Sequence, residues 1–396
     1  MTGSETTGAR PRVGVYNLYW STYGGGEQVA GAIALALVAD HDVVLLGPEP
    51  IDLQAMRDRL SLDLSPCGYE RVVDDETASA ASASYDLFVN ATYLSTAKNL
   101  ARSGLYYVYF PGTPSTRRQR VRQVIARGLA TCLRPVVGIP RLRRVHDGLE
   151  RRAAHTDWTR GYATFVCTSS FTVKWIERLW RVPAQALYPP VRPDVLPGTK
   201  GNTITSVGRF FDPKFGHCKK QLDLLRAFIE LERVGADGWR LELIGGADAP
   251  SRDYALAVRR EAQGHAVGVH FNAPRSLVRD TLAAASIYWH GTGYGEDANK
   301  HPDRFEHFGI AVVEAMAAGA VPIVFGAAGP AEIVRHGVDG FHWHTTAELV
   351  QFTRQLIADR DLRETMAENA QQRAHHFSDE VFAAALRSAV GCSTTL

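Results

Sequence analysis

"VGVYNLYWSTYGGGEQVAGAIALALVADHDVVLLG", residues 13–47, decides the fold of this chain. It opens with a short β-rich run and passes through three glycines into a helical pattern of small apolar residues. It closes with "DVVLLG", which reads as a second buried strand. A strand, a helix and a strand in that order are typical of a βαβ unit, in which helices cover a parallel sheet.

The alternation continues on both sides of a proline-rich segment. Apolar strands are predicted at residues 85–91, 105–110 and 163–169, before "LYPPVRPDVLPG" (187–198). Prolines make such a segment extended and semi-rigid, so it predicts a domain linker. The pattern then restarts with "TITSVGRF", "RLELIGG" and "SIYWHG". We therefore expect an α/β protein with two Rossmann-like halves and a ligand cleft between them, at the carboxyl ends of the strands.

Length and composition fit this picture. The chain has 396 residues, 45% of them apolar and 22% charged, with a formal net charge of +2. Its five cysteines are odd in number and lack C-x-x-C spacing, which favours a reducing compartment over a disulfide framework or a zinc site. Because residues 1–12 have no apolar core and residues 309–331 contain Glu314, Pro322 and several glycines, we expect no secretory signal and no membrane span. The predicted location is cytoplasmic.

Glycines follow the first strand in "YGGGEQVA", residues 23–30. Glycine lets a backbone approach a ligand closely, and the free N–H groups at a helix start favour an anion. The spacing is not G-x-G-x-x-G, so we do not infer NAD. A plain strand-to-helix turn is an equally good interpretation of this stretch alone.

Basic residues follow the first strand of the second half, in "SVGRFFDPKFGHCKKQ", residues 206–221. Arg209 abuts the strand end, and Lys214, Lys219 and Lys220 come before the next helix. Cations at this edge of a sheet suit a diphosphate. For any single lysine here a solvated loop is the simpler explanation, whereas Arg209 is the stronger candidate.

Two carboxylates flank an apolar run in "FEHFGIAVVEAMAAG", residues 305–319. Burial of an unpaired carboxylate costs several kcal/mol or more, so Glu306 and Glu314 require a reason. Carboxylates on one wall of a cleft bind sugar or ribose hydroxyls, and the N–H groups of Phe308, Gly309 and Ile310 are helix-start donors for an anion. The alternative is a pair of capping or ion-paired glutamates, but Glu314 has no cation at the i±4 positions.

With "GGGE", "YPPV", "LIGG" and "GPAEIVRHGVDGF", these stretches resemble the family 4 retaining glycosyltransferases, whose signature is E-x7-E and whose fold is GT-B. The resemblance covers most of the chain. It implies an N-terminal acceptor-side domain (1–190), a linker (191–200), a nucleotide-sugar domain (201–375) and a C-terminal helix (376–396) that crosses back to the first domain.

The resemblance also implies roles for the residues of the E-x7-E stretch. Glu306 matches the first glutamate, which lies against the donor sugar, and Glu314 matches the second, which binds the ribose hydroxyls. Phe308, Gly309 and Ile310 match the backbone segment that contacts the sugar and the diphosphate.

Roles for the basic and glycine segments follow in the same way. Arg209 and Lys219 match the pair that binds the diphosphate, with Lys220 as the alternative lysine because the intervening loop is longer than usual. Gly25 and Gly26 match the glycine loop that faces the diphosphate and the acceptor.

One position departs from the family pattern. Many relatives have a histidine where this chain reads "YVYFPG", with Tyr109 in its place. A tyrosine donates a hydrogen bond but cannot be cationic. We expect Tyr109 to contact substrate and not to act as a general base. The departure keeps open a sugar-nucleotide-binding protein that has lost catalysis, and a phosphorylase-like or epimerase-like GT-B enzyme is a further alternative.

The expected reaction moves a hexosyl unit from a GDP- or UDP-linked sugar to a hydroxyl acceptor with retention of configuration, by front-face attack. No metal or other cofactor is expected, since Arg209, Lys219 and the helix start neutralise the leaving group. "DRD" (359–361) lies in a helical region and not at a strand end, and the histidines of the loop at 290–307 lack H-E-x-x-H spacing.

Eleven arginines lie between Arg117 and Arg152, against Asp147 and Glu150. The interleaved apolar residues are consistent with peripheral contact with an anionic membrane, on the inner face, and the acceptor would then be lipid-linked. A solvated face explains the charges equally well. Nucleic acid is not expected, because no aromatic stacking pattern accompanies them.

Overall fold

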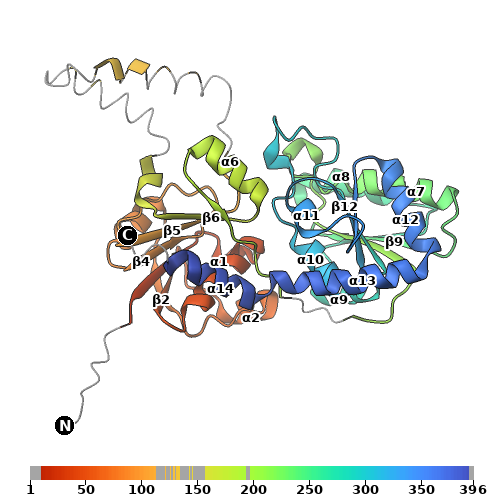
Figure 1. The fold of residues 1–396 in the computed structure, drawn as a ribbon, viewed down its shortest axis with the longest axis horizontal. Helices are drawn as coiled ribbons and strands as arrows, with labels where there is room; N and C mark the ends of the chain where they lie inside the picture. Colours follow the sequence, from red (N-terminus) through yellow and green to blue (C-terminus); the bar gives the residue numbers. More distant parts are fainter. Residues whose placement is uncertain are drawn as a thin grey trace, which may run out of the picture.

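The structure is a computed structural model that describes residues 10–112, 157–192 and 197–391, together with a few scattered positions between 121 and 145. The described chain forms two lobes side by side (Figure 1). Most of the segment between Arg117 and Arg152, part of the predicted linker and the chain ends lie outside the described residues, so the predictions made for them are not addressed by the fold.

The N-terminal lobe is built on a parallel sheet. Its described strands lie in the order β3-β2-β1-β4-β5-β6-β7. Their bounds are β1 Arg12–Tyr16, β2 Asp42–Gly47, β3 Gly68–Arg71, β4 Leu87–Asn90, β5 Ser103–Val108, β6 Thr164–Cys167 and β7 Gln185–Ala186. The helices are α1 Gly25–Leu37, α2 Leu53–Leu60, α3 Asp75–Ser82 and α6 Ser170–Trp180. The strand order reverses between β1 and β4, which opens a crevice at their carboxyl ends.

The C-terminal lobe repeats this design. Its parallel strands lie in the order β10-β9-β8-β11-β12-β13. Their bounds are β8 Thr203–Val207, β9 Arg240–Gly245, β10 Val267–Phe271, β11 Ile287–His290, β12 Val321–Phe325 and β13 Phe341–Trp343. The helices are α7 Gln221–Arg233, α8 Arg252–Glu261, α9 Arg275–Ala284, α10 Ile310–Ala317, α11 Ala328–Ile333, α12 Thr346–Ala358 and α13 Arg360–Ala374. Here the order reverses between β8 and β11.

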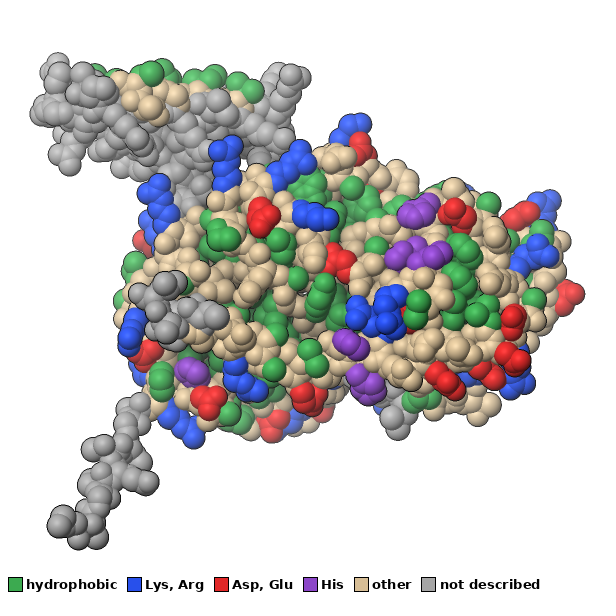
Figure 2. All heavy atoms as spheres, viewed as in Figure 1, with side chains coloured by type: hydrophobic (Ala, Val, Ile, Leu, Met, Phe, Trp, Pro, Cys, Tyr) green, Lys and Arg blue, Asp and Glu red, His purple; other side chains and the backbone are tan. Residues whose placement is uncertain are grey.

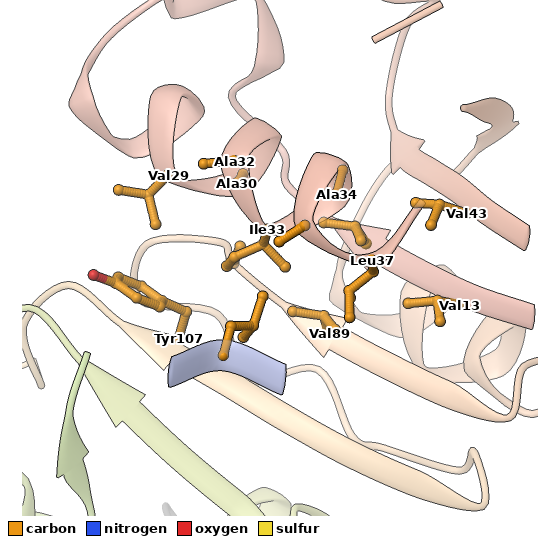
Figure 3. Close-up of a cluster of buried hydrophobic side chains, with 14 of the residues drawn as sticks. Val13, Val29, Ala30, Ala32, Ile33, Ala34, Leu37, Val43, Val89 and Tyr107 are labelled. Atoms are coloured by element: carbon orange, nitrogen blue, oxygen red, sulfur yellow. The ribbon is translucent and has the colours of Figure 1, made fainter. Parts of the chain in front are cut away.

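The first βαβ unit forms the centre of the N-terminal core. Helix α1 lays its apolar face over the sheet, and Figure 3 shows Val29, Ile33 and Leu37 on the side of α1 that faces the strands carrying Val13 and Val89. These helical positions are spaced by four residues and therefore share one face. All five side chains are at most 1% exposed. The residues between 13 and 47 thus form the unit that their pattern predicts.

The last described helix of the chain packs on the N-terminal lobe. After α13 it enters α14 (Asp379–Gly391), which lies beside α1 in the N-terminal lobe (Figure 1). Phe382 and Leu386 of α14 belong to the same buried cluster as α1. The guanidinium of Arg387 donates to the carbonyl of Ala36 over 3.0 Å, and Arg192 forms an ion pair with Asp379 at the start of the helix.

The lobes also contact each other directly across the cleft. The ring of Phe110, after β5, stacks on the imidazole of His307 with centroids 4.1 Å apart and an angle of 7° between planes. The hydroxyl of Thr168, after β6, donates to the carbonyl of His307 over 3.5 Å. The cleft is therefore narrow at this side, and the two lobes share a defined relative position.

Three further features of the described residues concern surface charge, membrane-spanning helices and metal ligands. On the face in Figure 2, basic and acidic side chains of the described residues are interspersed, without an extended region of one sign. No helix among the described residues is both long and apolar enough to cross a membrane. Within the same part of the chain, no three His, Cys, Asp or Glu side chains are grouped as a metal site would need.

Candidate active site

The main cleft lies between the lobes and has a volume of about 740 Å³. It lies at the carboxyl ends of the strands of the C-terminal sheet, beside the point between β8 and β11 where the strand order reverses. Both lobes line it. The predicted residues that line it are Gly25, Tyr109, Arg209, Lys219, Glu306, Phe308, Gly309, Ile310 and Glu314. The topology therefore brings together side chains from four separate stretches of sequence.

Glu306 lies at the centre of a charged group. Its carboxylate forms an ion pair with the ammonium of Lys219, and His290 Nε2 lies 3.5 Å from the same carboxylate oxygen, Oε2. The three side chains are at most 20% exposed. Burial is the largest single influence and would raise the pKa of Glu306, but the Lys219 cation, His290 and His217 together hold this pKa well below its usual range. Glu306 is therefore an anion available to accept hydrogen bonds.

Lys219 is held in place from two sides. Its ammonium lies 3.3 Å from His217 Nε2, while His217 Nδ1 lies 3.3 Å from the carbonyl of Asp303. Burial lowers the pKa of His217 to about 4, and the charge of Lys219 acts in the same direction. The imidazole is thus neutral at pH 7, with Nδ1 donating to the carbonyl and Nε2 accepting from Lys219.

The entrance of α10 provides backbone donors. Helix α10 begins at Ile310 after Gly309, whose φ of 119° is left-handed and favours glycine. The first N–H groups of a helix have no carbonyl partner in that helix and carry its positive dipole end. Phe308, Gly309 and Ile310 all line the cleft, so this end of the helix faces the space beside Glu306. A bound anion is stabilised at such a position.

Glu314 has a partner that its own helix does not supply. Arg275, at the start of α9, donates to Glu314 Oε1 over 2.6 Å. The helix itself supplies no cation at the i±4 positions, as expected, but the fold brings one from α9. Both glutamates are thus ion-paired, as in the alternative interpretation, and both also line the cleft. The carboxylate is 9% exposed while Arg275 is 45% exposed, so the pair lies where the cleft meets solvent.

The two adjacent lysines separate in the fold. Lys220 caps α7 with a left-handed φ of 60°, and its ammonium pairs with Glu296 at 2.7 Å, away from the cleft lining. The stem of Lys219 instead lies against Gly208, where an added Cβ would come within 2.7 Å of its Cγ. Lys219 thereby reaches the cleft beside Arg209. Of the two candidate lysines, the fold places Lys219 on the cleft lining and Lys220 outside it, because the left-handed turn at Lys220 directs the two side chains to different places.

The glycine loop and Tyr109 form one unit. Tyr109 is partly buried, and its hydroxyl donates to the carbonyl of Gly26 over 2.6 Å. Burial holds the pKa of Tyr109 well above its usual range, so the phenol stays protonated. Gly25 lines the cleft but Gly26 lies one residue further into α1, outside the lining. Tyr109 therefore holds the glycine loop in place through this hydrogen bond and also lines the cleft. The sequence did not indicate the contact with Gly26.

Several residues of the site were not predicted by the sequence. His217, His290, His307 and Arg275 line the cleft or contact residues that do. His290 and His307 belong to the loop at 290–307, whose spacing does not fit a zinc motif, and the sequence assigned no role to His217 in the basic segment. His290 could have been predicted from its position, because it ends a strand beside the point where the strand order of the sheet reverses.

The comparisons with known proteins agree with this architecture. Residues 191–373, the C-terminal lobe and its linker, match the family described as glycosyl transferases group 1. Over 215 residues the chain is 31% identical to the GDP-Man:Man(3)GlcNAc(2)-PP-Dol alpha-1,2-mannosyltransferase of Dictyostelium discoideum. That stretch is 50% of this chain and 40% of the relative, so the chain spans less than half of its length.

Solved structures show the fold. HepE of Anabaena in complex with UDP superposes with a TM-score of 0.69 at 16% identity, covering 96% of this chain and 100% of HepE. WaaG, a glycosyltransferase involved in lipopolysaccharide biosynthesis, gives 0.59 at 16% identity, over 95% and 99% of the two chains. The predicted fold class, GT-B with two Rossmann-like domains facing a central cleft, is confirmed. The matches to the family and to the mannosyltransferase also support the prediction of a glycosyltransferase.

Proposed function

We propose that the protein is a retaining glycosyltransferase of the family 4 type, which moves a hexosyl unit from a nucleotide sugar to a hydroxyl group. The observation that carries the proposal is the pairing of Glu306 with Lys219 at the entrance of α10, inside a cleft between two Rossmann-like lobes. A carboxylate accepts from sugar hydroxyls, whereas a lysine and helix-start N–H groups bind a diphosphate. The group thus offers both kinds of contact that a nucleotide sugar requires.

The proposed reaction breaks the bond between the anomeric carbon and the diphosphate oxygen. Lys219, Arg209 and the start of α10 stabilise the charge that develops on the leaving diphosphate. The acceptor oxygen bonds to the anomeric carbon from the same face, and its proton passes to the departing oxygen. Since cations of the chain face the leaving group, the proposal includes no metal. Activity should therefore survive treatment with EDTA.

The donor is proposed to be GDP- or UDP-linked. The mannosyltransferase relative is named for a GDP-linked donor, and HepE was solved with UDP-glucose. Arg275 and Glu314 line the same cleft and offer a hydrogen-bonding pair to a ribose. A thermal-shift panel with GDP-mannose, UDP-glucose and UDP-N-acetylglucosamine identifies the donor, because a ligand that binds the folded state raises its stability.

Transfer itself is tested with the preferred donor. Wild-type protein should release nucleoside diphosphate and form an α-configured product from an α-linked donor, as read by NMR. Glu306→Gln removes the anion but keeps the shape, and should abolish release. An inverted product would refute the retaining mechanism.

A second candidate is a sugar-nucleotide-binding protein without transferase activity. It is favoured by Tyr109, which is engaged with Gly26 and stands where related enzymes have a histidine. This candidate predicts donor binding in the thermal-shift panel, with no diphosphate release beyond that of Glu306→Gln. The same two measurements therefore separate binding from catalysis.

The acceptor is proposed to be lipid-linked, with contact between the segment from Arg117 to Arg152 and an anionic membrane. The segment has eleven arginines, and its described residues Val121, Ile125 and Leu129 are helical and 50%, 54% and 50% exposed. A spacing of four places them on one helix face, as in an interfacial helix. The relative's name, with its dolichol-linked acceptor, points in the same direction.

Pelleting with vesicles of phosphatidylglycerol tests the membrane contact. We expect pelleting at low salt and its loss at high salt, because charge attraction is screened. Ile125→Asp should weaken it by placing an anion on the apolar face. Failure to pellet at low salt would refute the contact without affecting the transferase proposal.

A further inference from the structure

His290 is a buried imidazole without hydrogen bonds. It ends β11, its side chain is 6% exposed, and neither ring nitrogen has a hydrogen-bond partner among the described residues. Buried polar groups in proteins are nearly always hydrogen-bonded, because leaving one unpaired costs about 1–3 kcal/mol. The two nitrogens therefore point to a partner that binds from outside the chain.

The position of His290 defines where that partner lies. The side chain lines the interdomain cleft, and its Nε2 is 3.5 Å from Glu306 Oε2, a separation without hydrogen-bond geometry. The ion pair between Glu306 and Lys219 holds the carboxylate in place. A neutral imidazole donor and an anionic acceptor thus lie next to each other on the floor of the cleft.

The charge of the two groups selects the chemistry of the ligand. Burial lowers the pKa of His290, which leaves the imidazole neutral at pH 7 with one N–H and one lone pair. Glu306 accepts only, so it repels a phosphate oxygen at this point. A hydroxyl group satisfies both, because its hydrogen goes to the carboxylate and its oxygen accepts from the imidazole.

We propose that His290 binds the transferred sugar of the donor, by donating to a ring hydroxyl whose own hydrogen is accepted by Glu306. The inference rests on the proposed function and adds a sugar contact that distinguishes sugar nucleotides from free nucleoside diphosphates. The diphosphate contacts remain with Lys219 and Arg209, which line the same cleft.

The test compares ligands with and without the sugar. Calorimetric titration of UDP-glucose, GDP-mannose, UDP and GDP is carried out on wild-type protein, His290→Leu and His290→Gln. We expect His290→Leu to raise the Kd of the preferred sugar nucleotide at least tenfold, while the Kd of the free nucleoside diphosphate changes less than twofold. His290→Gln keeps an N–H donor and should recover part of the loss. His376→Gln, an exposed histidine of the C-terminal segment, is the matched control.

Monodeoxy donors locate the hydroxyl. If His290 contacts one hydroxyl, the donor that lacks it binds wild-type protein and His290→Gln with nearly equal affinity, whereas the other deoxy donors keep the difference. This arm uses His290→Gln and remains informative if His290→Leu does not fold.

Each outcome has a defined meaning. An equal loss for sugar nucleotide and free diphosphate, or no loss for either, would overturn the role of His290. If the imidazole contacts only water, every deoxy donor would still bind wild-type protein more tightly than His290→Gln. That result would also overturn the role of His290. If wild-type protein neither binds nor turns over any of the sugar nucleotides, the proposed function itself fails, and the role of His290 fails with it.

Discussion

Glu332 Oε1 accepts a hydrogen bond of 2.7 Å from the backbone N–H of Phe171, although the two residues belong to different lobes. The second oxygen, Oε2, accepts from the N–H of Ser170 over 2.8 Å and from the hydroxyl of Tyr188 over 3.0 Å. A carboxylate from α11 thus caps the start of α6 across the interface. Anions at helix N-termini satisfy unpaired N–H groups and complement the dipole.

Glu332→Ala should loosen this interface. The variant removes an interaction worth about 1–2 kcal/mol at a helix start, so we expect the lobes to sample more open arrangements. Small-angle X-ray scattering should show a larger radius of gyration than wild-type protein in the absence of ligand.

Glu348→Ala is the matched control for Glu332. Glu348 accepts from the N–H groups of His344 and Thr345 at the start of α12, within one lobe. Glu348→Ala should lower thermal stability by an amount similar to Glu332→Ala, without changing the radius of gyration. Equal radii for wild-type protein and Glu332→Ala would contradict the role of Glu332 as a link between the lobes.

Lys219→Met should reduce kcat/KM for the donor by about 100-fold or more, since it removes a cation that stabilises the leaving diphosphate. Lys220→Met is the natural control, because Lys220 pairs with Glu296 outside the cleft and Glu296 retains Arg304 at 3.1 Å. Steady-state assays of diphosphate release compare the two. Equal losses in both variants would mean that the neighbouring lysines are not separated as the fold indicates.

Leu386→Ala should destabilise the N-terminal lobe by about 2–5 kcal/mol, the usual range for truncating a buried leucine. Leu386 is fully buried in the cluster that contains α1, although it comes from the C-terminal helix. Val381→Ala, on the same helix with a 48% exposed side chain, should cost far less. Urea denaturation measures both, and similar effects would show that α14 does not contribute to this core.

Stability should fall as the pH is lowered from 6.5 toward 4. Burial lowers the pKa of His217 from 6.5 to about 4, so in this window the unfolded chain takes up a proton that the folded protein refuses. The free energy of unfolding then decreases with falling pH, by at most about 1.4 kcal/mol per pH unit for this group.

His217→Gln isolates that contribution. The side-chain oxygen of glutamine can accept from Lys219 but does not titrate, so the variant should lose less stability than wild-type protein between pH 6.5 and 4. Urea titrations at several pH values provide the comparison. Parallel curves for the two proteins would contradict a depressed pKa for His217.

The alternating pattern predicted the central strands and helices of both lobes closely. "DVVLLG" became β2 with the expected bounds, and "TITSVGRF" and "SIYWHG" became β8 and β11. The edge strands β3 and β7 were not predicted. Strand β3 reads "GYER" and is largely exposed, and β7 has only two residues, so neither has the buried apolar run that marks a central strand.

The sequence by itself determined the α/β class, the two-lobed plan and the acidic and glycine stretches of the cleft, because these are set by local periodicity and by residue type at strand ends. The tertiary structure decided which charges meet. Lys219 and Glu306 are 87 positions apart, and Arg275 and Glu314 are 39 apart. Such pairs depend on the order of the strands and on the direction of single turns, such as the left-handed Lys220 that separates two adjacent lysines. No local pattern records that direction, since it is fixed only when the surrounding core packs.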